Sequence, residues 1–367
     1  MTITRITWYA APIRLTEPFV ISLGPLTHAN NVFVRLETDT GLTGWGEASP
    51  FPTVHGETME GVLTLGRFLG PLLLGYPLGT RGPAKIIELL DGAIFGNSCA
   101  KSALEIACYD LAARQVGMPL YQYLGGKNRP LWTDYTVSLG APEAMAHKAR
   151  WIVEQGFPAV KLKLGRADRD YERVAAVRAV IGPDLPLRLD ANQGWTRAEA
   201  LDLLPRLERF AIQHCEAPID RRDFIYLPAL RAATRIPLMA DEACWDHDDA
   251  RRLIELGAID RVNIKLSKSG GLTKALKILH LARKHELPVQ VGGFLETRLG
   301  FTAAAHFGAL AGIDFHDFDT PLMQETDPIL GGMVYGDNGR VTLPDIPGLG
   351  AEPDPAYLRE LQQFEVT

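Results

Sequence analysis

The sequence lacks the features that mark several common classes of protein. No apolar run reaches the roughly 18 to 20 residues that a membrane-spanning helix needs. The chain has no block rich in lysine and arginine, no low-complexity tract, and a formal net charge of −6. These absences argue against a nucleic acid or a membrane as partner. The N-terminal residues alternate like a strand and show no signal-peptide core, so we expect a cytoplasmic protein.

Cysteine is scarce, and its spacing offers no zinc site. The four cysteines are Cys99, Cys108, Cys215 and Cys244, and no CxxC pair is present. No histidine follows them at the spacing of a zinc-binding motif. We therefore expect four free, mostly buried thiols in a reducing compartment.

The N-terminal part of the chain reads as strands followed by helices. Residues 1–60 alternate as strands, with a hairpin turn at Asp39-Thr40-Gly41 and a loop over residues 17–30. Residues 57–124 carry apolar side chains at helical spacing. This order predicts an α+β domain over residues 1–125.

From Leu131 onward, strand patterns and helix patterns alternate, which is typical of βα units. We expect eight barrel strands at 133–138, 158–163, 186–190, 211–216, 236–241, 260–266, 288–293 and 313–318. The pattern predicts a (β/α)8 barrel or a close relative over residues 126–335. Residues 336–367 are expected to pack back on the first domain.

Five charged residues end short apolar runs in the barrel region: Lys163, Asp190, Glu216, Asp241 and Lys265. Neighbouring members of this set are separated by 24 to 27 residues, about the length of one strand, one loop and one helix. Because the carboxyl ends of the strands converge at one mouth of a barrel, we expect these side chains to form an active site.

The three carboxylates of this set predict a site for a hard cation. Asp190, Glu216 and Asp241 follow three consecutive strands and offer only oxygen ligands. Such a set favours Mg²⁺, or Mn²⁺ as a substitute, over Zn²⁺. Asn192 follows the first ligand and either supports the site or turns the chain.

The two lysines are candidate bases for removing a proton beside a carboxylate. A divalent ion would stabilise the enediolate that this removal forms. A lysine must be neutral to act as a base. A second cation about 7 Å away, at an effective dielectric of about 20, costs an ammonium roughly 2 kcal/mol. We therefore expect the pKa of Lys163 or Lys265 to be lowered toward neutrality.

These residues together resemble the enolase superfamily, in its muconate-lactonizing subgroup. The resemblance rests on K-x-K at 161–163, D-x-N at 190–192, Glu216 before Pro218, Asp241-Glu242, N-I-K-L at 263–266 and GGFLET at 292–297. It implies an α/β fold with an α+β N-terminal capping domain over a modified (β/α)7β barrel that binds Mg²⁺. It also implies that Lys161 and Glu296 bind substrate and that Glu242 supports the metal ligands.

Within that subgroup, the sequence is most similar to dipeptide epimerases such as the L-Ala-D/L-Glu epimerases. The last strand carries Asp317 and Asp319, which alternate onto one face. In dipeptide epimerases, a D-x-D at this place binds the free α-ammonium of the substrate, as two carboxylates sharing ammonium protons would. Gly24 stands where the Ala-Glu epimerases have arginine. Without that cation, the second residue of the substrate is expected to be apolar or is left unassigned by the sequence.

The function expected from these residues is therefore inversion of the α-carbon beside a dipeptide's carboxylate, by two-lysine 1,1-proton transfer. The alternatives are an N-acylamino acid racemase, an o-succinylbenzoate synthase or a muconate-type cycloisomerase. Outside this class stands a non-catalytic barrel, which replacement of a lysine or a ligand would have favoured. We expect a small-molecule substrate and a homo-oligomer.

Overall fold

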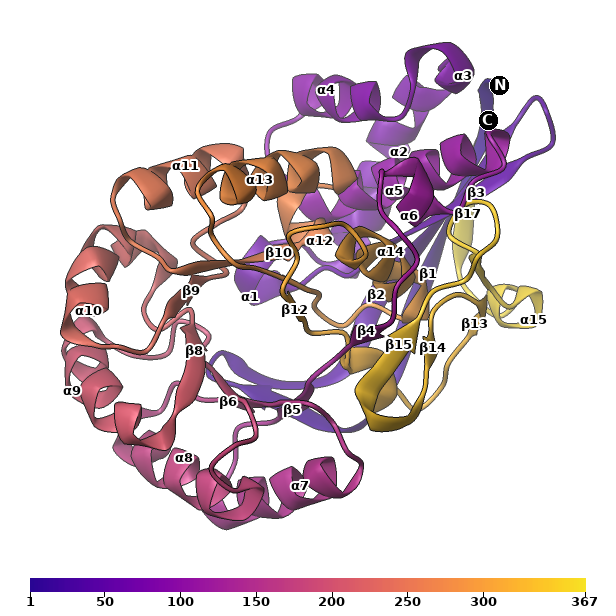
Figure 1. The fold of residues 1–367 in the computed structure, drawn as a ribbon. Helices are drawn as coiled ribbons and strands as arrows, with labels where there is room; N and C mark the ends of the chain where they lie inside the picture. Colours follow the sequence, from indigo (N-terminus) through magenta and orange to yellow (C-terminus); the bar gives the residue numbers. More distant parts are fainter.

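Two large sheets organise the chain, in a computed structural model that describes all 367 residues (Figure 1). One has four strands in the order β17-β1-β2-β3, and the other has eight strands in the order β12-β11-β10-β9-β8-β7-β6-β5. In Figure 1, the eight-stranded sheet curls into a barrel beside a smaller domain that carries both chain termini. This arrangement confirms the predicted modified barrel with an N-terminal capping domain.

The four-stranded sheet of the capping domain is antiparallel. Its strands are β1 (Ile3–Ile21), β2 (Gly24–Thr38), β3 (Thr43–Ala48) and β17 (Gln363–Val366). The predicted turn at Asp39-Thr40-Gly41 joins β2 to β3, as expected. The C-terminal β17 pairs with β1, so the two ends of the chain lie in one sheet.

The predicted loop over residues 17–30 was wrong, because these residues form the tip of the long β1–β2 hairpin. Phe19 pairs with Leu26 and Ile21 with Gly24, beyond an irregularity in the ladder that follows Arg14. Gly24 has φ +125°, a backbone conformation that suits glycine at the tight turn. Phe19 and Ile21 are buried in one cluster with the barrel core, and this packing outweighs the local proline and glycine signals.

The helices of the capping domain are α1 (Pro52–His55), α2 (Met59–Leu73), α3 (Leu78–Arg81), α4 (Ala84–Ala93), α5 (Ser98–Gln115) and α6 (Leu120–Tyr123). Helix α5 lies directly against β3, where two glycines remove the side chains that would separate them. A Cβ at Gly46 would stand 2.0 Å from the Ala103 carbonyl oxygen. The close contact fixes β3 relative to α5, and residues 99–113 of that helix are buried throughout.

The parallel strands of the barrel all fall within the predicted stretches: β5 (Tyr135–Val137), β6 (Val160–Lys163), β7 (Leu187–Asp190), β8 (Ile212–Glu216), β9 (Leu238–Ala240), β10 (Arg261–Lys265), β11 (Val289–Gly292) and β12 (Phe315–His316). The connecting helices, many of them seen around the ring in Figure 1, are α7 (Pro142–Glu154), α8 (Ala167–Ile181), α9 (Arg197–Leu207), α10 (Leu227–Ala233), α11 (His247–Glu255), α12 (Leu266–Ser269), α13 (Leu272–Lys284) and α14 (Arg298–Gly308). Short loops separate β7 and β8 from the helices that follow them. The polar residues that end these two strands lie at the barrel mouth.

Side chains join the first and last barrel strands, which share no backbone ladder. The Phe318 amide donates to Thr133 Oγ1 at 2.8 Å, and the Thr136 amide donates to Asp319 Oδ2 at 2.5 Å. Asp319 therefore closes the seam between β5 and β12. This contact places its carboxylate at the barrel mouth, beside the cavity described below.

Short elements complete the chain: β4 (Leu131–Trp132), β13 (Ile329–Gly331), β14 (Val334–Tyr335), β15 (Arg340–Thr342), β16 (Ala351–Pro353), α15 (Pro355–Leu358) and the 3-10 helices η1 (Glu208–Phe210), η2 (Arg221–Tyr226), η3 (Thr320–Met323) and η4 (Asp337–Gly339). None of the helices combines the length and apolar character needed to cross a bilayer. All four cysteines are free and buried, as predicted.

Candidate active site

The register of the parallel strands sets the charged residues side by side at the barrel mouth. Lys163 of β6 is the partner of Asp190 on β7, and Asp190 is the partner of Glu216 on β8. Asp241 comes directly after β9, and Lys265 ends β10. All five side chains are buried. The structure thus brings together the whole set that the sequence spacing picked out.

Ammonium and carboxylate groups alternate within this set. Lys163 Nζ lies 2.6 Å from Asp190 Oδ2, and Lys265 Nζ lies 2.7 Å from Asp241 Oδ2. Lys161, one layer below the mouth on β6, lies 2.8 Å from Glu216 Oε2 and 2.8 Å from Asp317 Oδ2. Because opposite charges interleave, the buried acids and bases compensate one another.

Two further side chains, neither of them predicted from the sequence, hold the carboxylates in place. Lys268 is fully buried and donates to Asp241 Oδ1 at 2.6 Å, to the Asp241 carbonyl at 2.6 Å and to the Asn263 carbonyl at 3.0 Å. Asn263 Nδ2 donates to Glu216 Oε1 at 2.5 Å. The motif N-I-K-L-S-K, with its second lysine three residues after Lys265, was the available signal.

Electrostatics separate the carboxylates into two kinds. Burial opposes ionisation of Asp241, but Lys265 and Lys268 outweigh it and hold its pKa well below the usual range. Burial raises the pKa of Glu216 to about 7, since Lys161 offsets only part of the cost. Burial and the nearby Asp241 together raise the pKa of Glu242 to about 8. Such divergent values are typical of functional sites.

The lowered lysine pKa expected from the sequence does not come from the protein groups alone. Burial favours the neutral amine of Lys265, but Asp241 and Glu216 outweigh it and raise the pKa above its usual value. A neighbouring lysine, Lys161, acts in the expected direction and is too weak. A divalent cation on the carboxylates would be needed to reverse the balance.

The donor set fits such a cation. Glu216 Oε2, Asp241 Oδ2 and Glu242 Oε2 are buried oxygens without a hydrogen bond of favourable geometry. Lysine ammonium groups lie 2.8 Å from Glu216 Oε2 and 2.7 Å from Asp241 Oδ2, and such buried, anionic oxygens suit Mg²⁺ or Mn²⁺. Asn192 lies next to this group. Its backbone amide donates to Asp190 Oδ1 at 2.9 Å, and its side-chain Nδ2 donates to Glu242 Oε1 at 3.3 Å. Asn192 therefore contacts both the predicted ligand Asp190 and Glu242, and their supporting roles remain predictions.

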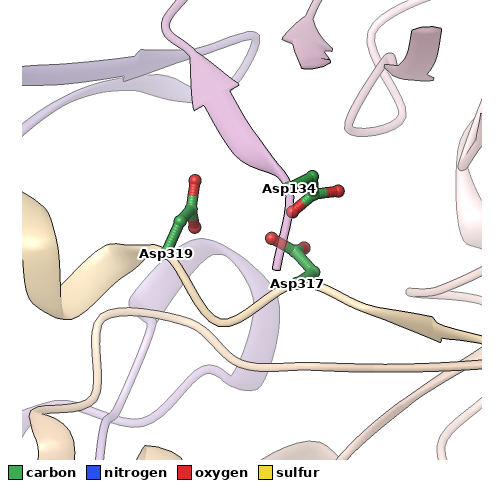
Figure 2. Close-up of side chains that lie close together, drawn as sticks. All are labelled: Asp134, Asp317 and Asp319. Carbon is green, nitrogen blue, oxygen red and sulfur yellow. The ribbon is translucent and has the colours of Figure 1, made fainter. Parts of the chain in front are cut away.

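A second group of carboxylates gathers at the seam of the barrel. Asp134, Asp317 and Asp319 each have an oxygen within 4.8 Å of the others, the only such set in the chain (Figure 2). Asp134 accepts from Arg188 at 2.7 Å, while Lys161 holds the pKa of Asp317 at about 2 against the cost of burial. Burial and the nearby Asp317 raise the pKa of Asp319 to about 7. Asp134 was not among the predicted residues.

A cavity lies between these two groups and under the β1–β2 hairpin. Its polar lining includes Lys163, Lys265, Asn192, Glu242, Asp317 and Asp319, and its apolar lining is Phe19, Ile21, Phe51, Val54, Phe294 and Leu295. Lys163 Nζ lies 5.7 Å from the Phe19 ring centroid, and Lys265 Nζ lies 4.5 Å from that of Phe294. Each lysine therefore enters the cavity beside its own aromatic ring.

Two predicted substrate-binding residues do not line this cavity. Lys161 is 1% exposed beneath it and is fully engaged by carboxylates. Glu296 accepts from Ser267 Oγ at 3.0 Å and from the Phe294 amide, so its carboxylate faces the protein. Both contact residues that do line the cavity.

Comparison with known proteins places this geometry in context. The model described as mandelate racemase / muconate lactonizing enzyme, N-terminal domain, matches residues 3–125, and the model described as enolase C-terminal domain-like matches residues 144–357. The D-Ala-D/L-Ala epimerase of Cytophaga hutchinsonii is 49% identical, covering 99% of both chains. The L-Ala-D/L-Glu epimerase of Bacillus subtilis is 39% identical, covering 95% of this chain and 96% of its own.

The similarity extends to solved structures. A crystal structure of a dipeptide epimerase from Cytophaga hutchinsonii, complexed with Mg and the dipeptide D-Ala-L-Val, superposes with a TM-score of 0.97. The two sequences are 48% identical and each chain is covered completely.

Proposed function

This chain belongs to the mandelate racemase / muconate lactonizing enzyme family, and we propose that it is a Mg²⁺-dependent dipeptide epimerase. The reaction inverts the α-carbon beside the carboxylate of a dipeptide. The relatives described above carry this class of activity in their names, and their similarity runs through both domains. The sequence motifs had predicted the same family.

One observation carries the proposal: the two lysines stand across the barrel from each other. They end β6 and β10, which are four positions apart in an order of eight strands. The carboxylates of β7, β8 and β9 occupy the arc between them on one side. Asp317 and Asp319, which follow β12, occupy the other arc. A substrate spanning the two arcs has its central carbon between the lysines.

The proton transfers follow from this placement. Lys163 and Lys265 each reach the cavity, so one removes the α-proton and the other delivers a proton to the opposite face. Asp190, Glu216 and Asp241 would hold the Mg²⁺, which supplies stabilisation of the negative charge that develops on the substrate carboxylate. Lys268 and Asn263 fix the orientations of two of these ligands.

Recognition of a free amino group is assigned to the seam carboxylates. Asp317 and Asp319 line the cavity, and Asp319 Oδ1 is buried with no hydrogen-bond partner. A substrate ammonium would supply the missing donor and a compensating charge. An N-acylated amino acid has no such cation and would leave Asp319 Oδ1 without a donor. This difference favours a dipeptide over the substrates of the N-acylamino acid racemases and cycloisomerases.

The remaining wall of the cavity favours an uncharged second residue. Apart from the two lysines, no cationic side chain lines it, and six lining residues are apolar. His55 follows the lining residue Val54 and packs on Phe294. Burial lowers the pKa of His55 to about 3, so this histidine is neutral and supplies no cation. A carboxylate on the second side chain would have no partner there.

Hydrogen exchange in D₂O tests the proposal. A library of dipeptides is incubated with the protein and Mg²⁺, and the mass gain and stereochemistry of each component are measured. We expect one deuteron at the carbon beside the carboxylate and interconversion of its two epimers. A preference for N-acylated amino acids over free dipeptides would instead identify an N-acylamino acid racemase.

We place this enzyme in the cytoplasm. The proposal is supported by Cys99, Cys108, Cys215 and Cys244, which all remain free thiols, as is usual in a reducing compartment.

A further inference from the structure

A buried glutamate of the capping domain joins it to the barrel beside the cavity. Strand β3 contains Gly44-Trp45-Gly46-Glu47, and alternate side chains face opposite sides. Gly44 and Gly46 face α5, where an added Cβ would lie within 2.4 Å of a carbonyl oxygen of that helix. Glu47 consequently faces the barrel, from a strand whose position α5 fixes.

The carboxylate of Glu47 receives four hydrogen bonds, three of them from the barrel. Oε1 accepts from the Thr297 amide at 2.8 Å and from Asn31 Nδ2 at 2.7 Å. Oε2 accepts from Thr297 Oγ1 at 2.7 Å and from the Gly300 amide at 2.7 Å. Thr297 is the N-cap of α14, so an acid of one domain satisfies the helix N-terminus of the other.

The anchored segment is a wall of the active site. Residues 293–297 connect β11 to α14, and Gly293, Phe294 and Leu295 line the cavity. Asn31 uses its amide a second time, donating to the Leu295 carbonyl at 2.8 Å. The Phe294 ring, 4.5 Å from Lys265 Nζ, is the aromatic neighbour of one lysine only. Lys163 has its own neighbour, Phe19, on the hairpin.

We propose that Glu47 is a positioning residue that acts across the domain boundary, fixing residues 293–297 and through Phe294 the lysine Lys265. The consequence for catalysis rests on the proposed epimerase function, whereas the anchor itself does not. Loss of the anchor displaces the wall beside Lys265 and leaves that beside Lys163 in place. Glu47 thereby affects solvent exchange of the α-proton unequally in the two epimers.

The chain offers a matched control in Glu57. This glutamate is also buried, and its two oxygens accept from the Cys99 and Ala100 amides at 3.0 and 3.2 Å. Both of its hydrogen bonds come from the N-terminus of α5, within the capping domain, and neither involves residues 293–297. Glu57→Gln makes the same replacement of a buried carboxyl group that accepts backbone amides, without crossing the domain boundary.

Amide hydrogen exchange, read by mass spectrometry, tests the anchor without any substrate. In Glu47→Gln, the glutamine NH₂ group replaces one carboxylate oxygen and cannot accept the hydrogen bonds that this oxygen accepted. Loss of hydrogen bonds to this buried carboxyl group corresponds to about a 10- to 100-fold change in an opening equilibrium. We expect exchange in the peptide spanning 293–301 to accelerate by at least about tenfold. In Glu57→Gln, acceleration should be confined to the start of α5. Unchanged exchange at 293–301 in Glu47→Gln overturns the proposal.

Solvent-deuterium incorporation into each epimer of a dipeptide substrate tests the catalytic consequence. Lys265→Ala first identifies the epimer whose exchange depends on Lys265. Since a displacement of about 1 Å costs about 100-fold in rate, Glu47→Gln should slow exchange of that epimer at least about tenfold more than the other. Thr297→Ser, which retains the hydroxyl donor, should preserve the wild-type ratio, and Thr297→Val should not.

Equal slowing of both epimers would show a merely structural role and overturn the positioning claim. If wild-type protein exchanges no dipeptide, the epimerase proposal fails, and the amide exchange still decides whether Glu47 anchors the segment.

Discussion

Lys163 and Asp190 are register partners on adjacent parallel strands, and the ammonium of the first lies 2.6 Å from Oδ2 of the second. The contact joins a proposed base to a proposed metal ligand. Lys265 and Asp241 repeat it across the barrel at 2.7 Å. Ligands and bases are therefore electrostatically linked, and the first two predictions below separate one from the other.

Removal of divalent cations should abolish activity. We expect protein treated with EDTA to be inactive and Mg²⁺ or Mn²⁺ to restore it, because Asp190, Glu216 and Asp241 offer oxygen ligands only. Asp241→Asn should weaken Mg²⁺ binding in titration calorimetry while leaving the far-ultraviolet circular dichroism unchanged. Full turnover by metal-free protein would contradict the assignment of these three residues.

Loss of either proposed base should stop epimerisation. Lys163→Ala and Lys265→Ala should each lower turnover by about 10²- to 10⁴-fold, the usual contribution of a positioned acid or base. Each variant should still exchange the α-proton of one epimer, and the two variants should differ in which one. Nuclear magnetic resonance in D₂O measures both quantities. Exchange of both epimers by the same variant would rule out two opposed bases.

Asp319 should contribute to binding of the substrate amino group. Asp319→Asn keeps an oxygen to accept from the Thr136 amide at the barrel seam and removes the charge. We expect kcat/KM for free dipeptides to fall by about 10- to 150-fold, as for loss of a hydrogen bond to a charged group. Glu325→Gln serves as the charge control. Glu325 is more exposed than Asp319, pairs with Arg14 and does not line the cavity. A variant that retains wild-type selectivity for free over N-acetylated dipeptides would refute the role.

The same residue predicts a pH dependence. Burial and the nearby Asp317 raise the pKa of Asp319 to about 7, so the carboxylate that attracts an ammonium forms as pH rises through that value. Binding of free dipeptides should therefore strengthen as the pH rises from about 6 to about 7.5, below the range in which the substrate's α-amino group loses its own proton. The profile of kcat/KM reports groups of the free enzyme. With saturating Mg²⁺, the inflection near 7 should be weaker in Asp319→Asn than in wild type, and an unchanged profile would assign it to another group such as Glu216.

The apolar wall predicts the choice of second residue. Dipeptides ending in alanine or valine should exceed the matching glutamate dipeptide in kcat/KM by at least about tenfold, since a buried carboxylate without a partner is costly. Ile21→Lys, at a residue that lines the cavity, should narrow this ratio by supplying a cation. Ile21→Met is the neutral control. Wild-type preference for the glutamate dipeptide would contradict the apolar assignment.

Much of the barrel was predictable because each strand carries a local signal. The apolar runs ending at Lys163, Asp190 and Glu216 fixed both the strands and the polar ends that meet at the mouth. A period of one βα unit is a property of the sequence itself. The inward convergence of these residues then follows from the parallel register, without any knowledge of individual contacts.

The residues that were missed act through contacts distant in sequence. Glu47 lies 250 residues before Thr297 and accepts hydrogen bonds from the backbone amide and the hydroxyl of that residue. Asp134 meets Asp317 only because the first and last barrel strands come together. The hairpin tip around Phe19 read as a loop, since its burial depends on the barrel beneath it. No local pattern encodes such partners, so tertiary packing decided them.

The fate of the α-proton during a single conversion tests the central claim most directly. One epimer of a good dipeptide is converted in D₂O with excess protein and Mg²⁺, and the product is analysed by mass and chirality before back-reaction. Transfer between two lysines on opposite faces predicts that the product epimer carries one solvent deuteron, because the accepting and donating groups differ. Product that retains the original hydrogen, or exchange without any inversion, would contradict the account.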